Sequence, residues 1–145
     1  MKNKKHTIAL ETEAAVRLHR FLSIISDNAY PVSDGQWQIN IGKNRIELWW
    51  DEIAAIRSVT DVIRQKFNKE GTHIVFNIKK KGVTVLCRLF DELENAIRSL
   101  IGLLYAFYIG DKEFLLSQSD YDSLLKCHQQ FREALPKKEN KDDNV

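Results

Sequence analysis

The side chains that could carry acid, base or metal chemistry are spread along this chain rather than grouped. Four histidines occur, at His6, His19, His73 and His128. No two of them have the i, i+4 spacing that lets one helix face bind zinc through both rings. We therefore expect no metal centre. His128 falls on the apolar stripe of a predicted helix, which favours a partly buried structural role.

The cysteines also form no nucleophile–base pair with a neighbouring histidine. Cys127 and His128 are adjacent, so on a helix their side chains diverge by about 100°. Cys87 follows a strand-like pattern that points it inward. Two thiols without a pairing motif are typical of a reducing compartment, so we expect no disulfide.

Motifs for catalysis and cofactor binding are missing from the sequence. It contains no Gly-rich phosphate loop, nucleophile elbow or dinucleotide fingerprint. The acidic pairs Asp51-Glu52 and Asp91-Glu92 precede helical patterns, where helix capping explains them without catalysis. We expect no cofactor. An enzyme with a site assembled from scattered residues ranks third among the functions considered.

Trp49 has no obvious apolar partner in its own predicted hairpin. In an alternating strand it shares the polar face with Arg45 and Glu47, and Gln38 lies across from them. Tryptophan is a frequent anchor in protein interfaces. The sequence therefore favours a non-enzymatic protein-binding module, such as an adaptor, inhibitor or regulatory subunit, which binds through these four residues. In the competing interpretation, a helix covers this face and Trp49 is core.

Lysines at two predicted turns support a nucleic-acid-binding module as the alternative function. Lys79, Lys80 and Lys81 form one hairpin tip, and Lys43 lies at the equivalent tip of the other hairpin. Side by side, these tips would contact phosphates. However, lysines at turns are commonly solvated, and they also discourage pairing at sheet edges.

Composition and charge fit a single intracellular domain. The chain of 145 residues has 22 basic and 20 acidic residues and is 43% hydrophobic, so no strong polyanion affinity is expected. We expect one domain over residues 1–136 and a disordered polar tail over 137–145. The basic start leads into no signal peptide, and the apolar run 100–109 is about half a bilayer span. A cytoplasmic protein with no membrane partner follows.

Hydrophobic alternation predicts two hairpins, each followed by a helix, in units over 36–69 and 72–109. Four-residue connections would set Ile41 opposite Ile46 and Ile78 opposite Val83, with Trp50 on the buried face. The fold class is α+β, with a mainly antiparallel sheet of four to six strands and about four helices. Either the resemblance of the units is an internal duplication of a β-hairpin–helix unit, or it arose by chance.

The apolar end of the second unit predicts a deeply buried helix. A helix over about 91–109 would be the most buried one, because its second half has almost no polar side. If that segment is instead exposed, it implies a homo-oligomer or another permanent partner.

Overall fold

The structure, a computed structural model, describes residues 5–67, 72–102 and 104–135. Four helices and eight strands follow one another in the order β1 (Lys5–Glu11), α1 (Thr12–Asn28), β2 (Tyr30–Ser33), β3 (Gln36–Ile41), β4 (Asn44–Trp49), α2 (Trp50–Lys66), β5 (His73–Lys79), α3 (Lys80–Ala96), β6 (Arg98–Leu100), β7 (Leu104–Ile109), β8 (Lys112–Ser117) and α4 (Gln118–Ala134). All paired strands are antiparallel. The predicted α+β class is confirmed.

The chain is built from two structural repeats. Residues 5–66 form the first repeat and residues 73–134 the second, and each element from β5 onward begins 68 residues after its counterpart. All four helices are 17 residues long. Six of the equivalent positions carry identical residues, namely Leu18/Leu86, Arg20/Arg88, Ile41/Ile109, Gly42/Gly110, Leu48/Leu116 and Arg64/Arg132.

An approximate two-fold axis relates the two repeats. β1 pairs with β5 so that Ile8 lies opposite Phe76, its own equivalent. β3 meets β7 where Ile41 lies opposite Ile109, another equivalent pair. Around this second pair the repeats exchange backbone hydrogen bonds, from Gly42 N to Tyr108 O at 2.8 Å and from Gly110 N to Asn40 O at 3.0 Å. Antiparallel pairing centred on equivalent residues is the geometry of an isologous dimer interface.

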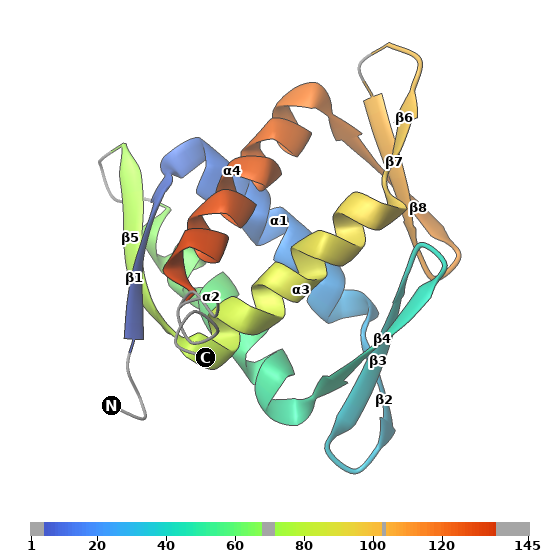
Figure 1. The fold of residues 1–145 in the computed structure, drawn as a ribbon, viewed down its shortest axis with the longest axis horizontal. Coiled ribbons are helices and arrows are strands. Elements are labelled where there is room, and N and C mark those ends of the chain that lie inside the picture. The colour runs from blue at the N-terminus through green and yellow to red at the C-terminus, as the bar shows by residue number, and fades with distance from the viewer. Residues whose placement is uncertain (1–4, 68–71, 103, 136–145) are drawn as a thin grey trace, which may run out of the picture.

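The helices lie between two layers of strands. The two-stranded β1–β5 ribbon covers one side, and the six-stranded sheet covers the other (Figure 1). Within this sheet β3 lies between β2 and β4, and β7 lies between β6 and β8. Apolar side chains from both repeats form one hydrophobic core, whose largest fully buried members include Phe90, Phe107 and Phe131.

Equivalent ion pairs join the repeats across the axis. Arg20 on α1 lies 3.9 Å from Asp120 on α4, and Arg88 on α3 lies 3.8 Å from Glu52 on α2. Glu52 and Asp120 are equivalent residues in the first turns of their helices, where a carboxylate also interacts favourably with the helix dipole. Asp120 gains a closer partner, because Arg17 Nε donates to it at 2.6 Å.

The contact between Arg17 and Asp120 can be tested by measuring the stability of the protein at acid pH. Burial alone raises the pKa of Asp120, but hydrogen bonds from Arg17 and Ser117 outweigh it and hold the pKa below its ordinary value. A depressed pKa contributes stability that is present above the unfolded-state pKa and lost as pH falls through the folded one. Asp120→Asn should therefore flatten the fall in unfolding free energy below about pH 4, measured by urea titration. Asp34→Asn, at an exposed turn, is the control, and identical profiles for Asp120→Asn and wild type would contradict the assignment.

The hairpin expected over the first part of 72–109 is wrong. β5 ends at Lys79, and residues from Lys80 onward form α3 instead of a returning strand. The positions of Val83, Leu86 and Phe90 also fit helical spacing, and α3 buries them between the ribbon and the other helices. Short apolar runs fit both the strand period of two residues and the helix period of about 3.6 residues, and tertiary packing decides for the helix here. Lys79, Lys80 and Lys81 consequently lie at a strand–helix junction, not at a hairpin tip.

The helix expected over 91–109 is also wrong. α3 ends at Ala96, and the chain continues into β6 and β7. Gly102, with φ +85°, lies in the left-handed region at the turn between these strands. The true counterpart of the hairpin–helix unit β3–β4–α2 is β7–β8–α4 at residues 104–134. The fold therefore does repeat such a unit, but the second copy lies further along the chain than 72–109.

The first hairpin forms within the expected unit, but with a different register. Gly42 and Lys43 make a two-residue turn, and Ile39, not Ile41, lies opposite Ile46. Gly42 has φ +62°, as two-residue hairpin turns require at their first position. The shift also places Trp50 at the start of α2, where it is exposed rather than buried.

Among the described residues, the structure contains no helix long and apolar enough to cross a membrane. The tail predicted over 137–145 lies outside the described residues.

Candidate protein-binding surface

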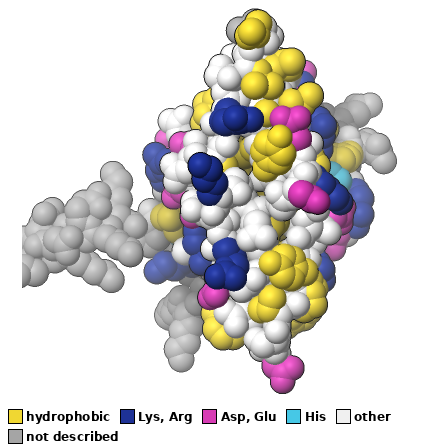
Figure 2. Space-filling model, turned by 90° about the vertical axis from the view of Figure 1, so that its right-hand side faces the viewer, with side chains coloured by type: hydrophobic (Ala, Val, Ile, Leu, Met, Phe, Trp, Pro, Cys, Tyr) yellow, Lys and Arg dark blue, Asp and Glu magenta, His cyan; other side chains and the backbone are white. Residues whose placement is uncertain are grey.

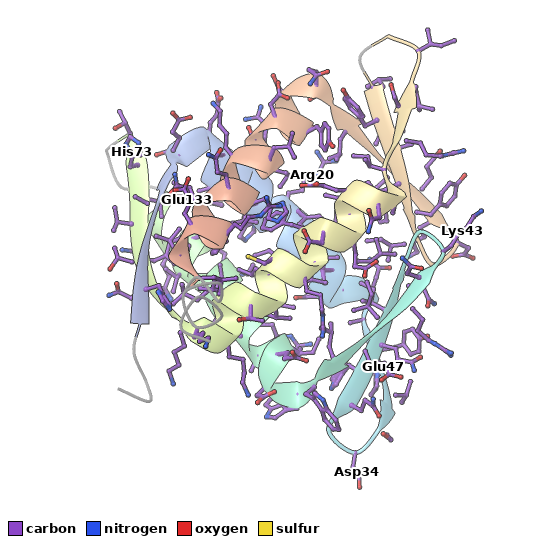
Figure 3. All side chains as sticks on the ribbon, in the orientation of Figure 1. Arg20, Asp34, Lys43, Glu47, His73 and Glu133 are labelled. Atoms are coloured by element: carbon purple, nitrogen blue, oxygen red, sulfur yellow. The ribbon has the colours of Figure 1, made fainter. Side chains whose placement is uncertain are left out.

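The four residues predicted to bind a partner do lie on one face. The pairing of β3 with β4 sets Gln38 opposite Glu47 and Gln36 opposite Trp49, with Arg45 further along the same face of β4. Arg45, Glu47 and Trp49 are exposed, whereas Ile46 and Leu48 between them are buried. This face is the solvent side of the sheet, where Figure 3 shows Glu47.

Two neighbouring tryptophans dominate this surface. Trp49 is 58% exposed and Trp50 is 56% exposed. Together with Gly35 and the side chains at the start of α2, they line a shallow hollow of about 360 Å³. We call the group formed by Gln38, Arg45, Glu47, Trp49 and Trp50 the tryptophan surface. The sequence pattern did not include Trp50, because alternation assigned it to the core.

Backbone hydrogen bonds fix the positions of both tryptophans. Trp49 N donates to Glu52 Oε1 at 2.8 Å, and Trp50 N donates to Gly35 O at 2.8 Å. Gly35 has φ +72° and lies in the turn between β2 and β3. Its carbonyl therefore ties this turn to the start of α2 through the Trp50 N–H. Both indoles therefore extend from a constrained backbone and lose little entropy there on binding.

The surface is also linked to the second repeat. Arg88 on α3 donates to the Glu47 carbonyl at 2.8 Å and lies 3.8 Å from Glu52. Beside Trp50, Lys81 donates a hydrogen bond to Asp51. This bond holds the pKa of Asp51 below its ordinary value and raises the pKa of Lys81, so both groups stay charged at neutral pH. The hollow thus combines exposed indoles with fixed charges of both signs.

The second repeat shows which residues the fold accepts at the start of the equivalent helix. The equivalents of Trp49 and Trp50 are Ser117 and Gln118 at the start of α4. Ser117 Oγ accepts the Asp120 N–H at 3.1 Å, which is standard helix capping. An indole has no acceptor for this N–H, and Trp49 makes no side-chain cap. Helix initiation therefore does not account for Trp49.

The predicted lysine patch is not brought together. Lys43 lies at the turn of the β3–β4 hairpin on the sheet side of the molecule, whereas β5 lies across the helices in the outer ribbon (Figures 1 and 3). Lys79 ends β5, Lys80 and Lys81 begin α3, and Lys81 is bound to Asp51. The four lysines therefore do not form one phosphate-binding track.

The buried histidine has a structural environment. His128 is 3% exposed and stacks on Phe90 with ring centroids 5.0 Å apart. Its Nδ1 lies 2.7 Å from Glu94 Oε2, and its Nε2 lies 3.2 Å from the Arg132 guanidinium. Both ring nitrogens thus have partners, as a buried imidazole needs.

The thiols are equally unsuited to nucleophilic chemistry. Burial and the nearby Asp91 carboxylate raise the pKa of Cys87 to about 11, and burial raises the pKa of Cys127 to about 12. Both therefore stay protonated at neutral pH, and a protonated thiol is a poor nucleophile. No group of three or more His, Cys, Asp or Glu side chains suited to a metal ion occurs in the part of the chain that the structure describes.

Comparison with known proteins adds no relative. The chain matches no protein-family model, no curated protein and no solved structure.

Proposed function

We propose that this chain is a protein-binding module, acting as an adaptor, inhibitor or regulatory subunit, which binds its partner through the tryptophan surface. The observation that supports this most directly is the exposure of Trp49 and Trp50 at a helix start where the second repeat has serine and glutamine. Two exposed indoles contribute neither to helix capping nor to core packing, which supports a role in contacts with another molecule.

The composition of the surface fits a protein partner. Tryptophan and arginine are enriched among the residues that dominate binding energy, and polar neighbours form the rim that excludes water. Trp49 and Trp50 would bury their indoles, while Gln38, Arg45 and Glu47 supply hydrogen bonds and charges around them. Since the charges at the hollow have both signs, the matching partner surface is mixed rather than strongly acidic or basic.

Site-specific cross-linking tests this proposal. A photoreactive amino acid at Glu47, next to Trp49 on β4, is irradiated in the protein's native cells, and the adducts are analysed. The control carries the same group at Ala9, an exposed residue on the opposite ribbon. We expect a discrete protein adduct from position 47 that is absent from position 9.

Competition then separates specific binding from chance proximity. In an extract of these cells, excess unlabelled wild-type protein should abolish the adduct, whereas excess Trp49→Ser protein should leave it. The proposal fails if no adduct forms at position 47, or if both competitors remove it equally. An adduct that nuclease digestion removes, with binding that weakens steeply with salt, would instead support the nucleic-acid alternative.

A further inference from the structure

The outer face of the second repeat's sheet is apolar. The pairing of β6, β7 and β8 places five apolar side chains on the side of the sheet that faces away from the helices, and we call them the leucine face: Leu100, Leu104, Ala106, Tyr108 and Leu115. Ala106 at its centre is fully buried, and the other four are exposed. Leu115 is 48% exposed, and Leu104 and Tyr108 are each 39% exposed. Figure 2 looks onto the sheet and shows hydrophobic side chains at its upper end, where β6–β8 lie, as well as a second group at its lower end. Contiguous exposed apolar surface commonly marks an interaction site.

The first repeat shows that the fold does not require this face. The equivalents of Leu104, Ala106, Tyr108 and Leu115 are Gln36, Gln38, Asn40 and Glu47. These polar residues occupy the same places on β3 and β4 without loss of the sheet. The apolar character of Leu104, Ala106, Tyr108 and Leu115 is thus an addition to the architecture, whereas Leu100 corresponds to the exposed Val32.

Two charged side chains flank the leucine face on opposite edges. Arg98 on β6 lies beside Ala106, and Glu113 on β8 lies opposite Tyr108. Both are exposed, and neither forms an ion pair with another residue in the described ranges. The face therefore has an apolar centre with one positive and one negative edge, which makes it complementary to itself.

We propose that a second copy of this chain packs on the leucine face, which makes the protein a symmetric homodimer. A two-fold axis that lies in the interface and runs oblique to β7 sets β6 of one copy across from β8 of the other. Arg98 is level with Ala106 and Glu113 is level with Tyr108, and the tilt of the axis brings these two levels together. Arg98 then meets Glu113 of the second copy, and the same pair recurs on the other side of the axis, as an isologous interface requires. The apolar centres cover each other, and side chains from two sheets interdigitate as in sandwich packing.

The dimer carries two copies of the tryptophan surface. Simultaneous use of both surfaces on a multivalent partner raises avidity without any new contact. Self-association itself does not depend on the proposed partner binding, so the two can be tested apart.

Grafting residues from the first repeat provides the test. Leu104→Gln with Leu115→Glu installs the residues that Gln36 and Glu47 supply on the equivalent face, so the sheet should still form. Sedimentation equilibrium is measured for the full chain over a range of concentrations. We expect a dimer for wild type and a monomer for the double variant, with unchanged far-ultraviolet circular dichroism. A wild type that stays monomeric up to about 1 mM, where pairing contributes no more than about 4 kcal/mol, overturns the proposal, and so does a double variant that stays dimeric.

Charge exchange tests the geometry. Arg98→Glu alone places two like-charged pairs in the interface and should weaken dimerisation by at least about tenfold. Combining it with Glu113→Arg restores opposite charges and should restore the dimer. Failure of this double exchange to recover association contradicts the proposed arrangement. Trp49→Ser is the control away from the interface and should leave the dimer intact.

Discussion

Replacing Trp49 with serine is expected to weaken partner binding by at least about 30-fold while leaving the fold unharmed. Truncation of a central interface tryptophan commonly costs about 2 kcal/mol or more, and each 1.4 kcal/mol is a factor of ten in Kd. The indole is mostly exposed, so its removal takes little from the core. The measurement is isothermal titration with the partner identified by cross-linking, together with thermal unfolding.

The same substitution should hold or raise the melting temperature. Serine is the residue that begins the equivalent helix α4, where its hydroxyl accepts the Asp120 N–H. A new serine cap on α2 would contribute about 0.5–2 kcal/mol. Lost binding combined with unchanged or increased stability is a result that a structural tryptophan cannot give.

Two controls accompany this experiment. Trp37 is half-buried and its ring stacks under Arg57, whose guanidinium carbon lies 5.5 Å from the ring centroid, so Trp37→Ser should lower the melting temperature. Replacing Lys79, Lys80 and Lys81 with alanine should change partner affinity little. If Trp49→Ser lowers the melting temperature as much as Trp37→Ser does, Trp49 is part of the core and the surface assignment is wrong.

Leu18→Ala and Leu86→Ala should each lower the free energy of unfolding by about 2–5 kcal/mol. The two leucines are equivalent in the repeats and are at most 1% exposed. Each lies on the first helix of its repeat, in the one core that both repeats share. The two losses should therefore be similar, and each variant should still unfold in a single cooperative transition. Urea titration followed by circular dichroism and by tryptophan fluorescence measures both properties.

Leu125→Ala is the matched control, because this leucine on α4 is 37% exposed and its truncation should cost clearly less. All tryptophans are in the first repeat, so fluorescence reports that repeat, whereas circular dichroism reports both. Non-coincident transitions by the two probes would show that the repeats unfold separately, contrary to a shared core.

Local patterns in the sequence determined much of the first repeat. The alternation of Ile46 and Leu48 with Arg45, Glu47 and Trp49 predicted one buried and one solvent face on β4, because successive strand side chains point to opposite sides. The same alternation identified Gln38, Arg45, Glu47 and Trp49 as neighbours on one face. The α+β class with antiparallel strands followed from segments that change between strand and helix periods.

The helices and strands of the second repeat could not be predicted from local sequence patterns, because tertiary packing determines them. Val83 and Val85 read as alternating strand residues, yet both are buried in α3, because the ribbon and the neighbouring helices cover that helix on several sides. The apolar run that includes Leu100 and Leu104 read as a buried helix, but Gly102 turns the chain there and the two leucines face solvent on β6 and β7. A uniformly apolar run carries no period, so packing decides its conformation.

The equivalence of residues 5–66 and 73–134 was not recognisable in the sequence, for a related physical reason. Burial preserves apolar character rather than identity, so Ile39 aligns with Phe107 and Ile56 with Leu124 although the residues differ. On the surface the repeats diverge freely, so Trp49 in the first repeat corresponds to Ser117 in the second, and Glu47 corresponds to Leu115. The sequence alone determined which side chains seek the core and which strand faces are polar. The tertiary structure decided which segments are equivalent, because strand pairing across the two-fold axis joins residues 68 positions apart.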